Sequence, residues 1–167
     1  MVLKNPDRPD MGNHVIMSGS CLSKIYNEYG VSPFQILDSM ARDARVTRLD
    51  IAVDIQHGYL DFNKLEQLIE YELITTDADT VHRFRGVTIR GDTIYIGGAQ
   101  SKLRVRIYDK AAELGNIDYE WTRIELQARK PKADTIKRSI FASGFSASCI
   151  PAIISGFVDF PTYGDWQ

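Results

Sequence analysis

The sequence predicts an α+β protein, with a mostly antiparallel β-sheet, helices packed on one face of it and an open polar face opposite them. Two observations predict this fold class. Segments 45–55, 102–110 and 119–129 alternate polar and apolar residues with the period of a β-strand. Segments with helix caps or a helical spacing of apolar residues lie before, between and after these strands.

The N-terminal part of the chain predicts one strand and one helix. HVIMSGS (14–20) is typical of a short strand that ends at Gly19. Pro33 suits the first turn of a helix with Ser32 as its N-cap, and we expect this helix to run to about Arg42.

A long strand and an amphipathic helix are predicted next. RVTRLDIAVDI (45–55) combines strict alternation with β-branched residues, which favours a strand. Asp61 is placed to cap a helix over 62–73. Its apolar stripe consists of Leu65, Leu68, Ile69 and Leu73.

The remaining elements begin with a predicted hairpin. HRFRGVTIR (82–90) and TIYIGG (93–98) are separated by Gly91-Asp92, a pair typical of a two-residue hairpin turn. After it the sequence predicts strands over 102–110 and 119–129, a helix over 131–142 and a short apolar helix near Pro151.

Length and composition favour one compact domain over residues 1–167. An apolar share of 44% and a charged share of 25% are typical of a soluble globular protein. No apolar run is long enough to span a bilayer, and the start MVLKNPDRPD lacks the apolar core of a signal peptide. We therefore expect a cytoplasmic protein without a membrane partner. The final FPTYGDWQ is typical of a chain that continues elsewhere.

The two cysteines, Cys21 and Cys149, lie far apart and belong to no CxxC pair. A disulfide in a secreted protein is the alternative, but two incidental thiols in a reducing compartment are favoured.

Charge is unevenly distributed although the net charge is only −2. Residues 57–80 are mainly acidic, whereas residues 83–110 and 123–138 are mainly basic. Such polarity is what a phosphate-binding face on a soluble domain requires. Ordinary solvated faces would give the same pattern, so charge alone does not decide between the two interpretations.

Alternation assigns the strand residues to two faces of the sheet. We expect helices to cover the apolar face, which consists of Leu49, Ile51, Val53, Val105, Ile107, Ile124 and Leu126. We expect the opposite face to be open to solvent, with Arg48, Asp50, Asp54, Arg104, Arg106, Tyr108, Lys110, Arg123, Glu125 and Gln127 on it. A salt-bridged, water-exposed sheet face is the plain structural alternative, but acids and bases on three successive strands favour a functional face.

Oxygen ligands on the polar face predict a site for Mg²⁺ or Mn²⁺ between Asp50 and Glu125. Asp54 lies about 13 Å from Asp50 along an extended strand, so both aspartates cannot bind one ion directly. Asp50 is the favoured ligand of the two, and His14 is a candidate third ligand.

A tyrosine on this face could attack a phosphodiester. The phenol has a pKa near 10, so it needs activation, and we expect Arg106 and Lys110 to favour the phenolate beside Tyr108. The alternation by itself does not select Tyr108 over Tyr95, which also lies on a predicted strand.

Three motifs resemble the replication initiation factor (Rep_trans) family, which includes plasmid rolling-circle initiators, phage replication proteins and related conjugative relaxases. They are VTRLDIAVD (46–54), TIYIGGAQSKLRVRIYDKAAELG (93–115) and WTRIELQARKPKA (121–133). VIMSGS (15–20) is also similar to the glycine-containing strand that opens the family's core. The chain departs from the family at Gly97-Gly98-Ala99, where Gly-Ser-Arg is usual, and it lacks an N-terminal helix-turn-helix and most of the usual C-terminal part.

The resemblance implies Tyr108 as the nucleophile, with Arg106 and Lys110 beside it as catalytic residues, and a metal held by Asp50, Asp54 and Glu125. Basic residues expected to bind DNA are Lys102, Arg104, Arg123 and Arg85. The implied activity is metal-dependent nicking and rejoining of single-stranded or origin DNA through a 5′-phosphotyrosine intermediate, as in rolling-circle replication of a plasmid or phage. A host helicase is a candidate partner.

Two other functions remain as alternatives. A conjugative relaxase would use the same chemistry, and nothing in these residues separates it from an initiator. A non-catalytic module would bind single-stranded nucleic acid by stacking bases on the sheet. Against that module, the polar face is expected to carry one tyrosine and several acids instead of two or three aromatic residues.

Overall fold

A computed structural model of the chain describes all residues except 5, 43, 57–59, 87–90, 116–118 and 162–167. The chain divides into two compact units, Met1–Arg45 and Val46–Gln167. The prediction of a single domain over 1–167 stays a prediction, and the last six residues of the expected chain continuation lie outside the described part.

The first unit contains a small two-stranded sheet and two helices. Strands β1 (Val2–Lys4) and β2 (Asn13–Val15) pair antiparallel, and the 3₁₀ turn η1 (Pro9–Met11) lies between them. Helix α2 (Pro33–Ala41) confirms the predicted helix, with a reciprocal capping box between Ser32 and Gln35. The expected strand over 14–20 is wrong beyond Val15. Gly19 begins helix α1 (Gly19–Tyr29) because the Ser18 hydroxyl accepts a hydrogen bond from the Cys21 amide and caps a new helix.

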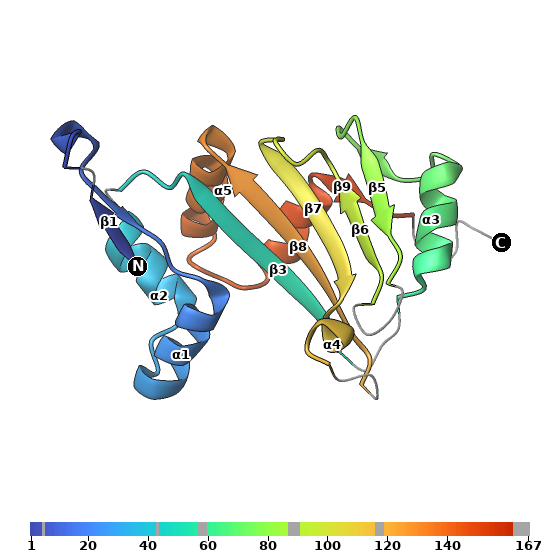
Figure 1. Ribbon diagram of the computed structural model, residues 1–167, viewed down its shortest axis with the longest axis horizontal. Coiled ribbons are helices and arrows are strands. Elements are labelled where there is room, and N and C mark those ends of the chain that lie inside the picture. Colours follow the sequence, from blue (N-terminus) through green and yellow to red (C-terminus); the bar gives the residue numbers. More distant parts are fainter. Residues whose placement is uncertain (5, 43, 57–59, 87–90, 116–118, 162–167) are drawn as a thin grey trace. The chain divides into compact units, whose positions relative to one another are not determined.

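The second unit contains a five-stranded sheet in the order β3-β8-β7-β6-β5, with every neighbouring pair antiparallel (Figure 1). The strands are β3 (Arg48–Gln56), β5 (Val81–Phe84), β6 (Thr93–Ile96), β7 (Leu103–Asp109) and β8 (Trp121–Arg129). Two short strands, β4 (Thr75–Thr76) and β9 (Val158–Asp159), form a separate antiparallel pair. The predicted α+β class with a mostly antiparallel sheet is confirmed.

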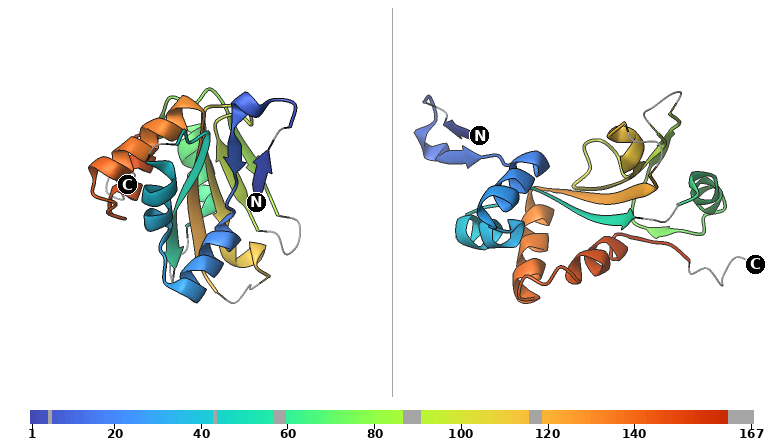
Figure 2. Two further views of the ribbon diagram at one scale, coloured as in Figure 1. Left: turned by 90° about the vertical axis from the view of Figure 1, so that its left-hand side faces the viewer. Right: turned by 90° about the horizontal axis from the view of Figure 1, so that it is seen from below.

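Helices of the second unit lie on both faces of the sheet. They are α3 (Phe62–Glu70), α4 (Lys110–Glu113), α5 (Pro131–Ala142) and α6 (Cys149–Ser155). Figure 2 shows α5 and α6 on one face and the single turn of α4 on the opposite face. The expected covering of one face by helices is therefore right for α5 and α6. It is wrong for α4, whose start at Asp109 ends the predicted strand before Lys110.

The face beneath α5 and α6 holds the apolar core. Of the residues assigned to it, Ile51, Val105, Ile107 and Leu126 are buried, and Leu49, Val53 and Ile124 are half-buried. Helices α5 and α6 contribute Ala133, Ile136, Ile140, Ile150 and Ile154. Each large apolar side chain removed from water stabilises the fold by about 1.5–3 kcal/mol.

The connection from β5 to β6 differs from the predicted two-residue hairpin. Phe84 pairs with Thr93, so the connection runs from 85 to 92, and residues 87–90 of it lie outside the described part of the chain. Gly91 has φ of 61°, and a Cβ atom there would lie 2.6 Å from the Cβ of Asp109. Glycine is thus required by a close approach to the start of α4, and not by a tight hairpin turn.

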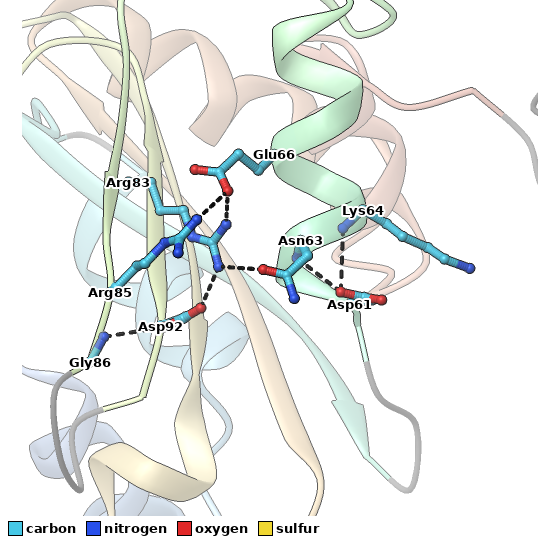
Figure 3. Close-up of polar contacts among 8 residues, drawn as sticks. All are labelled: Asp61, Asn63, Lys64, Glu66, Arg83, Arg85, Gly86 and Asp92. Atoms are coloured by element: carbon cyan, nitrogen blue, oxygen red, sulfur yellow. Dashed lines mark hydrogen bonds and ion pairs between the residues drawn. The ribbon is translucent and has the colours of Figure 1, made fainter.

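A cluster of charged side chains joins β5 to helix α3 (Figure 3). Arg83 forms ion pairs with Glu66 of α3 and with Asp92, the latter at 2.6 Å, and its Nη2 also donates to Asn63 at 3.2 Å. The Arg83 side chain is only 10% exposed. Removing one member of such a buried network leaves the others without partners, so the cluster fixes the edge strand β5 against α3.

Within the described residues, no helix has both the length and the apolar character needed to cross a membrane. Cys21 belongs to the first unit and Cys149 to the second, and both are free cysteines.

Candidate functional site

The strand register places the candidate residues in rows that run across the polar face of the sheet. The row through the predicted nucleophile consists of Asp54, Arg123, Tyr108, Thr93 and Phe84, each directly opposite the next. Directly opposite side chains point to the same face, with Cβ atoms about 4.5–5.5 Å apart. Tyr108 therefore lies between Arg123 and a small threonine.

The next two rows contain further acids and bases, and Arg48 lies opposite Arg129 in the row after them. One row consists of Ala52, Glu125, Arg106, Tyr95 and His82, and the other of Asp50, Gln127 and Arg104. Glu125 is thus opposite Ala52, so Asp50 and Glu125, between which the metal site is predicted, are not directly opposite each other. Glu125 instead lies diagonally between Asp50 and Asp54, because Asp50 is opposite Gln127, two residues further along β8.

Tyr108 lies on the polar face as predicted, but it is not open to solvent. Only 3% of the residue is exposed. The Arg106 guanidinium carbon lies 3.7 Å from the centre of the phenol ring, and the Lys110 Nζ lies 5.7 Å from it. The alternation identified the face correctly, whereas the covering of the ring by neighbouring cations follows from contacts that alternation does not describe.

The pKa of Tyr108 is raised above its usual value, first by burial and then by the carboxylates of Glu113 and Glu125. Lys110 and Arg123 act in the opposite direction without reversing the shift. Lys110 therefore favours the phenolate, as expected, but burial and the two carboxylates outweigh it and the net pKa is raised. Arg106 stacks on the ring face, and Lys110 forms an ion pair with Glu113.

Glu113 is a site residue that the sequence reasoning missed. Its Oε1 accepts a hydrogen bond from Arg106 Nη2 at 3.3 Å, and its Oε2 pairs with Lys110. Although burial opposes the shift, the contacts with Lys110 and Arg106 lower the pKa of the Glu113 carboxyl. The sequence signal that could have identified Glu113 is Asp109, whose side chain caps a helical turn. In that turn Glu113 follows Lys110 by three residues, so the two side chains lie on the same side of the helix.

Asp54 is fully engaged by its neighbours. Arg123 donates to it twice, from Nε to Oδ1 at 2.7 Å and from Nη2 to Oδ2 at 2.8 Å, and Trp121 Nε1 donates at 2.8 Å. Burial opposes the shift, but these hydrogen bonds lower the pKa of Asp54. The bond to Asp54 is also the main cause that raises the pKa of Arg123. Both carboxylate oxygens of Asp54 accept hydrogen bonds, three in all, and its role as a metal ligand stays a prediction.

Asp50 and Glu125 form the carboxylate pair that suits a cation. Arg48 donates to both oxygens of Asp50, from Nε at 3.1 and 3.2 Å and from Nη2 at 2.7 Å, whereas no hydrogen bond to the Glu125 side chain is present within the described part of the chain. The pKa of Glu125 is raised, first by burial and then by the charge of Asp50. Groups of three or more acids, histidines or cysteines that could hold a metal are absent among the described residues. The exposed Asp50 and the half-buried Glu125, two mutually repelling carboxylates, nevertheless fit Mg²⁺, which commonly uses one or two carboxylates and keeps several waters. His14, the candidate third ligand, lies on β2 of the first unit.

The four basic residues expected to bind DNA are not all on one surface. Arg104 and Arg123 lie on the polar face, where Arg104 stacks 3.8 Å over the ring of Tyr95. Arg85 pairs with Glu66 of helix α3 at 2.9 Å, beside Arg83 (Figure 3). Lys102 precedes β7 and lines a shallow depression that also contains Asp77, Asp79 and Lys132.

Aromatic residues are more numerous on the polar face than the sequence analysis expected. Phe84, Tyr95 and Trp121 lie on it together with Tyr108, because the register places all four on one side of the sheet. Phe84 and Tyr95 contact each other edge to face, with ring centres 5.7 Å apart. The expectation of a single tyrosine on this face is wrong. The additional aromatic residues make the face better suited to base stacking than the sequence predicted.

The chain is similar in sequence to a protein family and in fold to a solved structure. A sequence profile described as replication initiation factor matches residues 44–165. No curated protein matches the chain. Among solved structures, the rolling circle replication initiator protein from Geobacillus stearothermophilus has a TM-score of 0.77 and 25% sequence identity, over 94% of this chain and 62% of that one. The chain thus spans less than two thirds of the length of that protein.

Proposed function

The chain belongs to the replication initiation factor family, and from that premise we propose that it nicks and rejoins single-stranded DNA at a replication origin through Tyr108. The observation that carries the proposal is the position of Tyr108 on a sheet face with Arg106, Lys110 and Arg123 around it. A tyrosine hydroxyl among three cations is suited to attack on a phosphodiester, because the cations can hold the phosphate and offset the charge that develops on it.

The proposed reaction exchanges one phosphodiester for another. The Tyr108 Oη gives up its proton to solvent, attacks phosphorus and forms an O–P bond. The bond from phosphorus to the 3′-oxygen breaks, and that oxygen takes up a proton from solvent and leaves as a 3′-hydroxyl, so the step involves no net gain or loss of protons. The 5′ phosphate remains on the tyrosine, so a later attack by a 3′-hydroxyl reverses the step without ATP. Because Arg106 covers the ring in the free protein, DNA must draw the Arg106 guanidinium from the ring to the phosphate.

Two carboxylates would hold the metal that this family's chemistry implies. Asp50 and Glu125 are the residues that fit a divalent cation such as Mg²⁺ or Mn²⁺, which when bound would polarise the phosphate oxygens. Asp54 has a different role in this proposal. Its two hydrogen bonds orient Arg123, and Arg123 is directly opposite Tyr108.

Covalent capture of DNA tests the proposal. The protein is incubated with Mn²⁺ and a random-sequence single-stranded library labelled at the 3′ end, because the 3′ fragment is the one that stays on the tyrosine. We expect a labelled band that survives denaturing electrophoresis, and sequencing of the captured DNA would give the nicking site. Tyr108→Phe should abolish this band with DNA affinity nearly unchanged, whereas the matched control Tyr95→Phe should retain it.

A band that persists in Tyr108→Phe would assign the nucleophile to another tyrosine. Binding of the library without any adduct in the wild type would favour the second candidate, a non-catalytic module for single-stranded nucleic acid. The burial of Tyr108 and the aromatic residues on the same face are the observations that favour this second candidate. A conjugative relaxase would give the same adduct, and the captured sequence would decide between the two. A host helicase stays a candidate partner.

A further inference from the structure

Phe84 is a large apolar side chain that the described residues leave mostly uncovered on the polar face. It ends β5, the edge strand of the five-stranded sheet, and remains 59% exposed. Phe84 is opposite Thr93, which is opposite Tyr108. Two strand spacings, about 10 Å, therefore separate the backbones of Phe84 and Tyr108. An exposed aromatic ring so near the nucleophile is suited to contact a substrate.

The ring of Phe84 is supported before any ligand binds. It contacts the ring of Tyr95 edge to face, with centres 5.7 Å apart and planes at 84°. Arg104 stacks on Tyr95 with its guanidinium carbon 3.8 Å from the ring centre. The neighbouring residue Arg83 points away from this face and anchors β5 to Glu66 of α3 (Figure 3). A ring held in place in this way loses little conformational freedom when a second ring stacks on it.

Arg104 and Arg129 are the arginines of the polar face that have no acidic partner among the described residues, and Arg129 instead donates to the Ala99 carbonyl and to Gln127. Arg106 pairs with Glu113, and Arg123 pairs with Asp54. The Nε of Arg104 is buried and has no hydrogen-bond partner in the described part of the chain. A fixed and uncompensated cation beside an open aromatic ring is complementary to an anion that carries a flat apolar group.

We propose that Phe84, Tyr95 and Arg104 form a site for one nucleotide of single-stranded DNA, with the base stacked on Phe84 and its phosphate on Arg104. The site rests on the proposed function in that the strand it holds is the one that Tyr108 attacks. Stacking uses the ring face that every base has, so the site tolerates different bases and sets the position of the strand on the sheet.

Binding of a fluorescent single-stranded oligothymidylate to the full chain, followed by anisotropy, tests the site. Phe84→Ala removes the stacking contact with one base and should therefore weaken DNA binding about 5- to 150-fold relative to the wild type. Phe84→Trp should bind as tightly as the wild type. Phe84→Leu keeps apolar volume without a π face and should bind weakly, so the comparison does not depend on the alanine variant alone. Tyr71→Ala removes an equally open aromatic residue at the end of α3 and should have no effect.

An abasic residue moved along the oligonucleotide locates the stacked base. The wild type should lose affinity at one position, and Phe84→Ala should no longer distinguish that position. Equal affinities of Phe84→Ala and the wild type would overturn the site. The site would also be overturned if Phe84→Ala dissociated an oligomer of the protein and left DNA binding unchanged. The ring would then belong to a protein–protein interface. Failure of the wild type to form the Tyr108 adduct would overturn nicking but would leave these binding results unaffected.

Discussion

Arg123 holds Asp54 through two parallel hydrogen bonds of 2.7 and 2.8 Å, and the register places the same arginine directly opposite Tyr108. A two-point contact between a guanidinium and a carboxylate fixes the plane of the arginine as well as its position. Asp54 therefore acts on Tyr108 through Arg123. In the free protein this predicted metal ligand is paired with an arginine.

Asp54→Asn should destabilise the fold by about 1–2 kcal/mol, because it removes the charge from a half-exposed pair with good geometry. The pKa of Asp54 is lowered in the folded state, so the pair stabilises the protein above the unfolded pKa of about 3.9 and loses this effect as pH falls through the folded pKa. Urea unfolding at pH 7 and pH 3 would measure it. A difference between wild type and variant that is as large at pH 3 as at pH 7 would contradict the ion-pair explanation.

Metal binding should distinguish the three predicted acids. Asp50→Asn and Glu125→Gln should each weaken Mn²⁺ binding at least tenfold, because each removes one of two carboxylates from the ion. Asp54→Asn should leave the affinity within about twofold of the wild type. Calorimetric or paramagnetic titration of the full chain with Mn²⁺ measures these affinities. If Asp54→Asn weakened Mn²⁺ binding as much as Glu125→Gln, Asp54 would be a metal ligand.

Much of the fold could be predicted because local signals and the final structure agree. The alternation at Arg48–Gln56 and Trp121–Arg129, and the caps at Ser32 and Asp61, each specify one element with little competition. Two errors have the same cause. The predicted strands over 14–20 and 102–110 each extend past the point where a helix begins, at Gly19 and at Lys110. In both cases a side-chain cap starts the helix within a sequence that still has a strand pattern. Caps of short helices are detected only when each Ser or Asp is examined for them.

The candidate site was predicted less completely than the fold because it depends on register. Alternation tells which residues share a face, but not which residue of one strand is opposite which residue of the next. Alternation places Asp50 and Glu125 on one face, but only the register shows that Glu125 is opposite Ala52 and not opposite Asp50. The burial of Tyr108 and the role of Glu113 depend on contacts between long side chains. The alternation of the strands contains no information about such contacts.

Arg106→Ala should weaken both DNA binding and adduct formation. The lost charge-assisted phosphate contact is worth about 1.5–3 kcal/mol, which corresponds to roughly 10- to 150-fold in affinity. The slope of log affinity against log salt should decrease by about 0.7, the value for one phosphate of a single strand. Arg138→Ala on α5, which packs against the other face, is the matched control and should change neither quantity. An unchanged salt slope in Arg106→Ala would show that Arg106 only covers the ring and does not contact a phosphate.

Glu113 should control the ionisation of Tyr108. Burial and the Glu113 carboxylate are the first two causes of the raised pKa of Tyr108, so replacing Glu113 by glutamine removes a negative charge and should lower that pKa. The absorbance change of phenolate formation, taken as wild type minus Tyr108→Phe, should titrate above the usual value of about 10. The same difference measured in the Glu113→Gln background should titrate at lower pH.

The same substitution releases Arg106 and Lys110 from their shared carboxylate, which makes both cations available to a phosphate. Glu113→Gln should therefore bind single-stranded DNA more tightly, by up to about fivefold for the loss of a part-exposed ion pair. Glu120→Gln, an exposed acid outside this contact, should change neither the Tyr108 titration nor the affinity. If Glu113→Gln lowers the pKa of Tyr108 but weakens DNA binding, Glu113 orients the two cations toward the phosphate instead of competing with it.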